Sequence, residues 1–282
     1  MRRSCGICFG FISSIVSDMN EQEVYPNAPL VLVALEVRHP TTELLTQMQL
    51  NALKSRLASK FPLMRKAKEA SFQFGLPGGP PETVVEEFAK FFNRENTISI
   101  SMRSSSIVIE ASDYPGWEAF RAIAAEALSA RIAVSVLDGI ERVGLRYIDE
   151  IRVPQPEAGW DEWLSSSVLG PLSTGIAMSL TAWQGNAVYG DANSSALVLR
   201  YGLYDGAAVD SSELRRIRPI AHSKFFLLDI DSYWIPDNGT PEFEIEHVLG
   251  VIDRLHDPVR SLFESLITTR YRDSILRNAN AS

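Results

Sequence analysis

The sequence predicts an α+β protein, in which the strands of an antiparallel sheet carry long amphipathic helices packed on one face. Residues 29–40, 141–154 and 224–234 alternate apolar and polar side chains, which is typical of strands with one buried face. Residues 117–136 and 248–266 instead repeat apolar residues every three or four positions, as amphipathic helices do. Because strands precede a helix in each part of the chain, the pattern favours α+β and allows two pseudo-repeated halves.

The stretch 141–154 is the predicted central strand. Val143 and Leu145 lie on its apolar side, and Arg142 and Arg146 lie on its polar side. An apolar helix precedes the strand and a proline- and glycine-bearing segment follows it, so the strand is expected to end the first half. The predicted divisions are a leader or misannotated start at 1–18, an N-terminal α+β half at 19–154 and a C-terminal α+β half at 155–282.

The N-terminal half is expected to begin with a strand that Pro40 ends, because proline cannot donate a ladder hydrogen bond. The other elements predicted here are a helix at 42–60 capped by Thr41 or Thr42, a short strand at 68–74, a glycine-rich loop at 75–81, a short helix or irregular connection at 82–92, a hairpin at 97–102 and 106–111, and the helix at 117–136.

The C-terminal half is predicted to contain a second hairpin before the strand at 224–234. Its predicted elements are a short helix at 160–169, hairpin strands at 174–188 and 195–204, and a helical segment at 248–266 that is kinked or divided at Asp257-Pro258. Asp257 could cap a new helix with Pro258 at its first position, so one kinked helix and two consecutive helices both stay open.

Composition indicates an ordinary globular chain. Of its 282 residues, 45% are hydrophobic and 22% are charged, which suffices for a core without staples. The net charge of −8 argues against a broad nucleic-acid surface. The two cysteines, Cys5 and Cys8, cannot hold the fold by a disulfide, which suits a reducing cytoplasm.

The first 18 residues are compositionally unlike the remainder. Arg2 and Arg3 precede an apolar run at 6–16, which is similar to a short secretory leader. The alternative, which we favour, is that translation begins at Met19 and that the preceding residues are misannotated.

Arginines occur opposite the apolar side of several predicted strands. If these strands are neighbours, their guanidinium groups line one sheet face and could bind an anionic ligand or an acidic partner. The alternative is that these arginines simply pair with glutamates across strands. The candidate ligand-binding residues are Arg38, Arg142, Arg146, Arg200 and Tyr204.

Carboxylates gather near the end of the strand at 224–234. Asp229 and Asp231 share one side of that strand, and Glu244 follows after a turn. Three converging carboxylates could hold Mg²⁺ or Ca²⁺. The alternative is a solvated strand face followed by an acidic helix N-terminus, which the helix dipole favours.

Several motifs follow one another along the chain: Pro26-Asn-Ala-Pro-Leu-Val31, Glu36-Val-Arg38, Val143-Gly-Leu-Arg-Tyr-Ile148, Leu227-Leu-Asp-Ile-Asp231, and Leu255-His256 leading to Phe263-Glu-Ser-Leu-Ile-Thr268. Their order and spacing resemble a sporadically distributed family of bacterial proteins with no assigned function. The resemblance covers the chain from about residue 24 and implies no activity, cofactor or catalytic residue.

The sequence therefore predicts a non-catalytic cytosolic binding protein that recognises an acidic protein partner or a small anionic ligand. We expect no cofactor, no membrane association and no nucleic-acid partner, and a homodimer stays open. The alternative is a metal-dependent hydrolase or nuclease that uses Asp229, Asp231 and Glu244.

Overall fold

The computed structural model describes residues 24–73, 82–154, 159–170, 178, 182–209, 213–218 and 224–278. The predicted leader and the loop at 75–81 lie outside these residues. The strands are β1 (Leu30–Arg38), β2 (Leu63–Gln73), β3 (Glu82–Phe92), β4 (Ile98–Met102), β5 (Ser106–Ala111), β6 (Arg142–Ile151), β7 (Trp183–Asp191), β8 (Ser195–Asp205) and β9 (Lys224–Trp234). The helices are α1 (Gln47–Leu57), α2 (Trp117–Ile132), α3 (Ile245–Leu266), α4 (Thr269–Tyr271), the 3₁₀ turns Trp160–Glu162 and Ser166–Val168, and the π-turn Arg272–Leu276.

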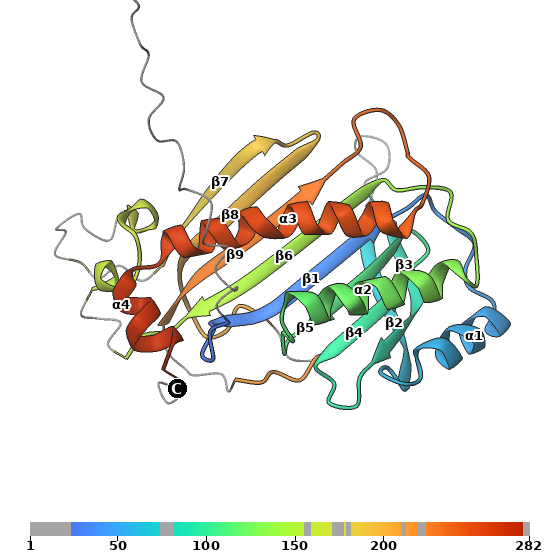
Figure 1. The fold of residues 1–282 in the computed structure, drawn as a ribbon, viewed down its shortest axis with the longest axis horizontal. Helices are drawn as coiled ribbons and strands as arrows, with labels where there is room; N and C mark the ends of the chain where they lie inside the picture. The colour runs from blue at the N-terminus through green and yellow to red at the C-terminus, as the bar shows by residue number, and fades with distance from the viewer. Residues whose placement is uncertain are drawn as a thin grey trace, which may run out of the picture.

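The described strands form one antiparallel sheet in the order β2-β3-β4-β5-β1-β6-β9-β8-β7 (Figure 1). The α+β class and the antiparallel sheet are thus confirmed. The predicted central strand is β6, which pairs with β1 on one side and β9 on the other. Strands from both predicted halves join in this sheet, and a duplication of the halves stays a prediction.

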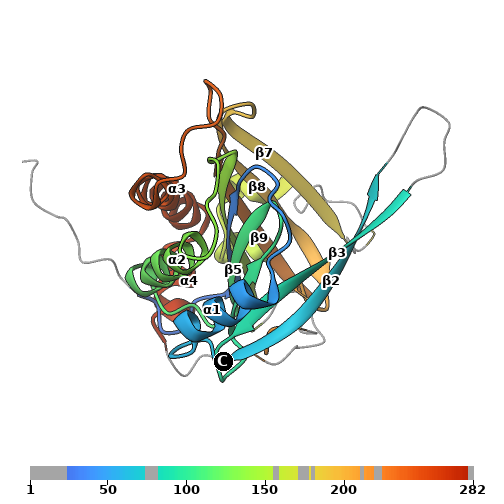
Figure 2. The same ribbon diagram turned by 90° about the vertical axis from the view of Figure 1, so that its right-hand side faces the viewer.

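The alternation of β6 gives the sheet a buried and an open face. Val143 and Leu145 are fully buried, whereas Arg146 is exposed on the opposite side. Figure 2 shows α1, α2 and α3 on the same side of the sheet. Val143 and Leu145 belong to the same buried core cluster as residues of these helices, so they face this side. The side of the sheet that carries Arg146 therefore has no described helix over it.

The prediction of long amphipathic helices is wrong as a general description. Only α3, with 22 residues, is long, whereas α1 and α2 have 11 and 16 residues. The helix α2 contacts both α1 and α3, so it buries side chains on several sides rather than along one stripe. Its buried residues are Phe120, Ile123, Ala124, Ala127, Leu128, Ala130 and Arg131.

The helix α1 begins later than predicted because a better cap lies downstream. The Thr46 side chain accepts a hydrogen bond from the Gln49 backbone, and the Gln49 side chain accepts one from the Thr46 backbone. This reciprocal capping box satisfies two backbone donors, which Thr41 and Thr42 do not do here. Leu44 and Met48 are mostly exposed, whereas Leu45 packs against the core.

One further prediction fails for a tertiary reason. Residues 82–92 form strand β3, which pairs along its length with β2, so long-range pairing overrides the ambiguous local pattern. Of the two alternatives at Asp257-Pro258, the structure has a single helix, since α3 continues through that proline. Among the described residues, no helix combines the length and the apolar character needed to cross a membrane.

Candidate functional site

The predicted arginines meet on the open side of the sheet. Arg38 comes from β1, Arg142 and Arg146 come from β6, and Arg200 comes from β8. These strands are neighbours through β9, whose register sets Asp229 opposite Arg200 and Asp231 opposite Arg146. We use the name arginine face for this set: Glu36, Arg38, Arg142, Arg146, Arg200, Asp229 and Asp231.

On the arginine face, the carboxylate of Asp229 contacts Arg146 and Arg200. Arg146 donates to both of its carboxylate oxygens, with Nε–Oδ1 and Nη2–Oδ2 distances of 2.6 and 2.7 Å. Arg200 Nη1 lies 3.4 Å from Oδ2 of the same carboxylate. The hydrogen bonds that Arg146 donates to Asp229 raise the pKa of Arg146, so this guanidinium stays charged.

The carboxylate of Glu36 contacts the two other arginines of this face, Arg38 and Arg142. Its Oε2 accepts hydrogen bonds from Arg38 Nε and Arg142 Nη1, each at 2.9 Å. Arg142 reaches Glu36 by lying across Gly144, where a Cβ would be 2.5 Å from its Nη1. The same guanidinium lies 4.7 Å above the ring of Tyr233. Because Gly144 has no side chain, the Arg142 side chain can lie across it and join the arginine face.

Three of the four guanidinium groups of the arginine face are more exposed than its carboxylates, whereas Arg142 is 19% exposed and its partner Glu36 is 27% exposed. The side chains of Arg38, Arg146 and Arg200 are 53%, 45% and 47% exposed. Those of Asp229 and Asp231 are 5% and 17% exposed. Burial, the main cause, raises the pKa of Asp231 against the opposing effect of nearby arginines. The groups that this face exposes to solvent are therefore chiefly guanidinium groups.

Tyr204 lies apart from the arginine cluster, although it comes from the same strand as Arg200. Its hydroxyl donates to Gln184 Oε1 at 2.9 Å, and its ring stacks on Phe225 with centroids 6.0 Å apart. Its role as a ligand-binding residue stays a prediction.

The carboxylates of the metal alternative do not converge. Asp229 and Asp231 lie on the arginine face, whereas Glu244 is the exposed N-cap residue of α3, which packs on the other side of the sheet. Within the described ranges, no group of three His, Cys, Asp or Glu side chains is arranged to hold a metal ion. Both oxygens of Asp229 are already bound by arginines.

We accordingly expect no rise in melting temperature when millimolar Mg²⁺, Mn²⁺ or Ca²⁺ is added. A bound ion would stabilise the native state in proportion to the logarithm of its concentration. Thermal unfolding of the native protein and of Asp229→Asn/Asp231→Asn makes the comparison. A dose-dependent rise that the double variant loses would instead favour the hydrolase or nuclease.

Sequence reasoning missed a second charged cluster at the end of β6. Glu150 accepts hydrogen bonds from Arg152 and Arg216, and the Ala208 backbone N–H donates to it at 2.7 Å. Despite burial, these bonds lower the pKa of Glu150. Because Arg216 is used here, the basic stretch at 215–218 is partly neutralised within the fold.

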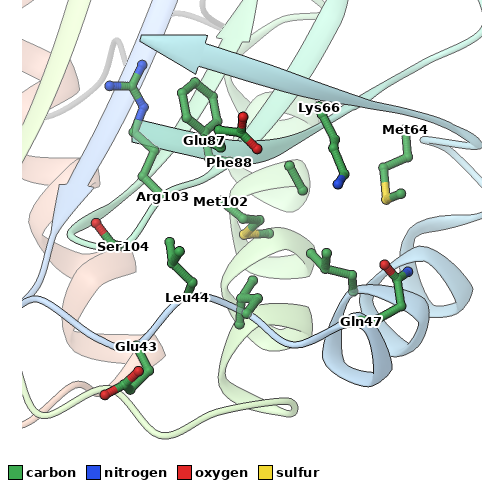
Figure 3. A pocket seen from close by; sticks show the side chains of 13 residues that line it. Glu43, Leu44, Gln47, Met64, Lys66, Glu87, Phe88, Met102, Arg103 and Ser104 are labelled. Atoms are coloured by element: carbon green, nitrogen blue, oxygen red, sulfur yellow. The ribbon is translucent and has the colours of Figure 1, made fainter. Parts of the chain in front are cut away.

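Two cavities lie among the residues that the structure describes. Figure 3 shows the smaller one, of about 210 Å³, with Leu44, Met64, Phe88 and Met102 among its lining side chains. The larger, of about 510 Å³, lies between the N-terminal segment, the start of α2, the end of β6 and the second half of α3. Asp149, one of its polar residues, left a signal in the sequence, because it occupies the apolar side of the predicted central strand.

Comparison with protein-family models found no match for this chain, and comparison with curated proteins found none either. The argument for function therefore rests on the geometry above.

Proposed function

We propose that this protein is a non-catalytic binding protein whose arginine face recognises an acidic protein partner. The observation that carries the proposal is that the half-exposed guanidinium groups of Arg146 and Arg200 share the nearly buried carboxylate of Asp229. The proposal includes a cytoplasmic location, which the two cysteines near the N-terminus suit, and membership of the bacterial family that the motifs resemble.

The exposed arginines retain unused hydrogen-bond donors. A guanidinium has five N–H donors, and Arg146 commits two N–H groups, on Nε and Nη2, to Asp229. The underlying carboxylate also holds each guanidinium in place, which reduces the rotamer entropy lost when a partner carboxylate binds. The face is thus preorganised for carboxylate groups.

The shape of the face favours a macromolecule over a small ligand. The arginines come from three strands, β1, β6 and β8, and no described helix lies over them (Figure 2). None of the residues of this face lines either cavity described above. Small ligands usually bind in concave sites that bury most of their surface, so a partner protein fits this face better. The net charge of −8 makes a protein partner a better fit than nucleic acid.

The test is the binding of a fluorescein-labelled oligoglutamate peptide, measured by fluorescence anisotropy. The variant is Arg38→Gln/Arg200→Gln, which leaves Arg142 on Glu36 and Arg146 on Asp229. We expect the affinity to fall by about tenfold because two exposed donors of charge-assisted hydrogen bonds are lost. Added salt should weaken the native interaction as well.

The matched control is Lys54→Gln/Arg56→Gln, which removes the same charge from the exposed surface of α1 on the other side of the sheet. This control should bind the peptide nearly as the native protein does. Equal losses in both double variants would mean that only net charge matters and would refute recognition by the arginine face. Tighter binding of a single-stranded DNA oligonucleotide than of the peptide would also contradict an acidic protein partner.

A further inference from the structure

The larger cavity has a wall of neutral aromatic groups. The hydroxyl of Tyr147 on β6 lies 2.9 Å from Nδ1 of His256 on α3, and the hydroxyl of Tyr114 lies 3.5 Å from that of Tyr147. Trp117 stacks on the His256 ring, with centroids 4.0 Å apart and planes 2° from parallel. Burial lowers the pKa of His256 to about 4, and burial raises that of Tyr114 to about 12. This wall therefore carries no charge at neutral pH.

One end of the cavity is polar, and its groups are not satisfied by each other. Asp149 lies on the buried side of β6, is 5% exposed and lines the cavity. In the part of the chain that the structure describes, no hydrogen bond or ion pair reaches its carboxyl group. A buried polar group without a partner costs free energy, so it marks a place where a ligand would be stabilising.

Arg218 supplies a positive charge to the same cavity. Its Nη2 donates to Oδ1 of Asn27 at 2.8 Å, and Asn27 is a neutral amide. Its neighbour Arg216, by contrast, is neutralised by Glu150. Among the described residues, Arg218 forms no ion pair with a carboxylate. Burial lowers its pKa, but a guanidinium remains charged at neutral pH.

We propose that the cavity binds a small organic monocarboxylate with an apolar, aromatic body. Its carboxylate would lie between Arg218 and the protonated carboxyl group of Asp149, and its body would lie along Tyr114 and Trp117. A cavity of about 510 Å³ is within the usual range for small-molecule sites, and a few convergent polar groups at one end are typical of them. At this end of the cavity, the guanidinium of Arg218 and the neutral donor on Asp149 match a single negative charge, and Arg260 adds a second cation to the lining.

The state of Asp149 gives the site a pH dependence. Burial, the main cause, and Asp229 together raise the pKa of Asp149 to about 8 against the opposing effect of Arg218. Tyr271 interacts with Asp149 as well, and the other ionisable groups that line the cavity are Tyr25, Asp113, Tyr114, Tyr147, Arg216, His256, Arg260 and Glu264. The tyrosines have raised pKa values and His256 a lowered one, so Asp149 is the group that titrates near pH 8. Its ionised form would repel a bound carboxylate.

The test is isothermal titration calorimetry of the full chain with 2-naphthoate, its neutral analogue 2-naphthamide, and inorganic phosphate. We expect saturable binding of 2-naphthoate alone. The affinity should fall by about tenfold or more in Arg218→Gln, and between about pH 7 and about pH 9 in the native protein. Asp149→Asn keeps a donor but cannot ionise, so its affinity should not change over that interval.

Arg215→Gln is the matched control, because Arg215 is an exposed neighbour that does not line the cavity. It should bind 2-naphthoate as the native protein does. Equal binding of the amide or of phosphate, no saturable binding at about 1 mM 2-naphthoate, or equal losses in Arg215→Gln and Arg218→Gln would each overturn the proposal. Because the native protein is compared with three ligands, the result does not depend on any variant folding. The arginine face plays no part in this experiment.

Discussion

Asp149→Asn should raise the free energy of unfolding at neutral pH, by an amount that grows as the pH rises. In the native state burial raises the pKa of Asp149 from 3.8 to about 8. At pH 7 the native carboxyl group is therefore protonated, whereas the unfolded one is ionised. Taking up that proton on folding costs on the order of 4 kcal/mol at pH 7, and asparagine avoids this cost.

The direction in which stability changes with pH follows from the number of protons that the folded and unfolded states bind. A carboxyl group with a raised native pKa binds more protons in the folded state than in the unfolded state. The contribution of Asp149 to the free energy of unfolding is therefore largest below about pH 4, falls as the pH rises to about 8, and is constant above about pH 8. The difference between Asp149→Asn and the native protein should follow the same interval.

Urea unfolding at several pH values measures this difference. Asp237→Asn is the control, because Asp237 is an exposed carboxyl in the turn after β9. Its effect on the free energy of unfolding should be small at every pH. A gain for Asp149→Asn that is the same at pH 4 and pH 8 would show that the native carboxyl group is not held protonated.

The sequence predicted the sheet well because strand alternation depends on local pattern. The side of β6 that carries Val143 and Leu145 is buried as expected, and Arg146 lies on the open side. The same alternation also contained an unused signal. Asp149 occupies the buried parity, where an apolar residue is expected, and a carboxyl at such a position is a candidate functional group.

The rest of the site depends on contacts between residues far apart in the sequence. Trp117 and His256 stack although they belong to different helices, and Arg218 reaches Asn27 near the other end of the chain. No local spacing encodes such contacts. The arginine face was more accessible to prediction, because its members were already assigned to strands and only the neighbour order was missing.

Leu145→Ala should lower the free energy of unfolding by about 2–5 kcal/mol, as other large-to-small changes in a core do. Leu145 is completely buried in the middle of the sheet, opposite Leu35 on β1 and Ser232 on β9. The substitution removes buried methyl groups and leaves a cavity that flanking strands cannot close. Leu44→Ala is the matched control, because Leu44 is 64% exposed and the same change there should cost less than about 0.5 kcal/mol.

Arg146→Ala, at the next residue of β6, should cost less, about 1–2 kcal/mol. It removes a bidentate partner from the buried Asp229, which is destabilising, but the guanidinium is 45% exposed and Arg200 remains 3.4 Å from the same carboxylate. Chemical denaturation of the three variants gives the comparison. A larger loss in Arg146→Ala than in Leu145→Ala would mean that the charged lattice, and not the apolar side of β6, holds the centre of this sheet together.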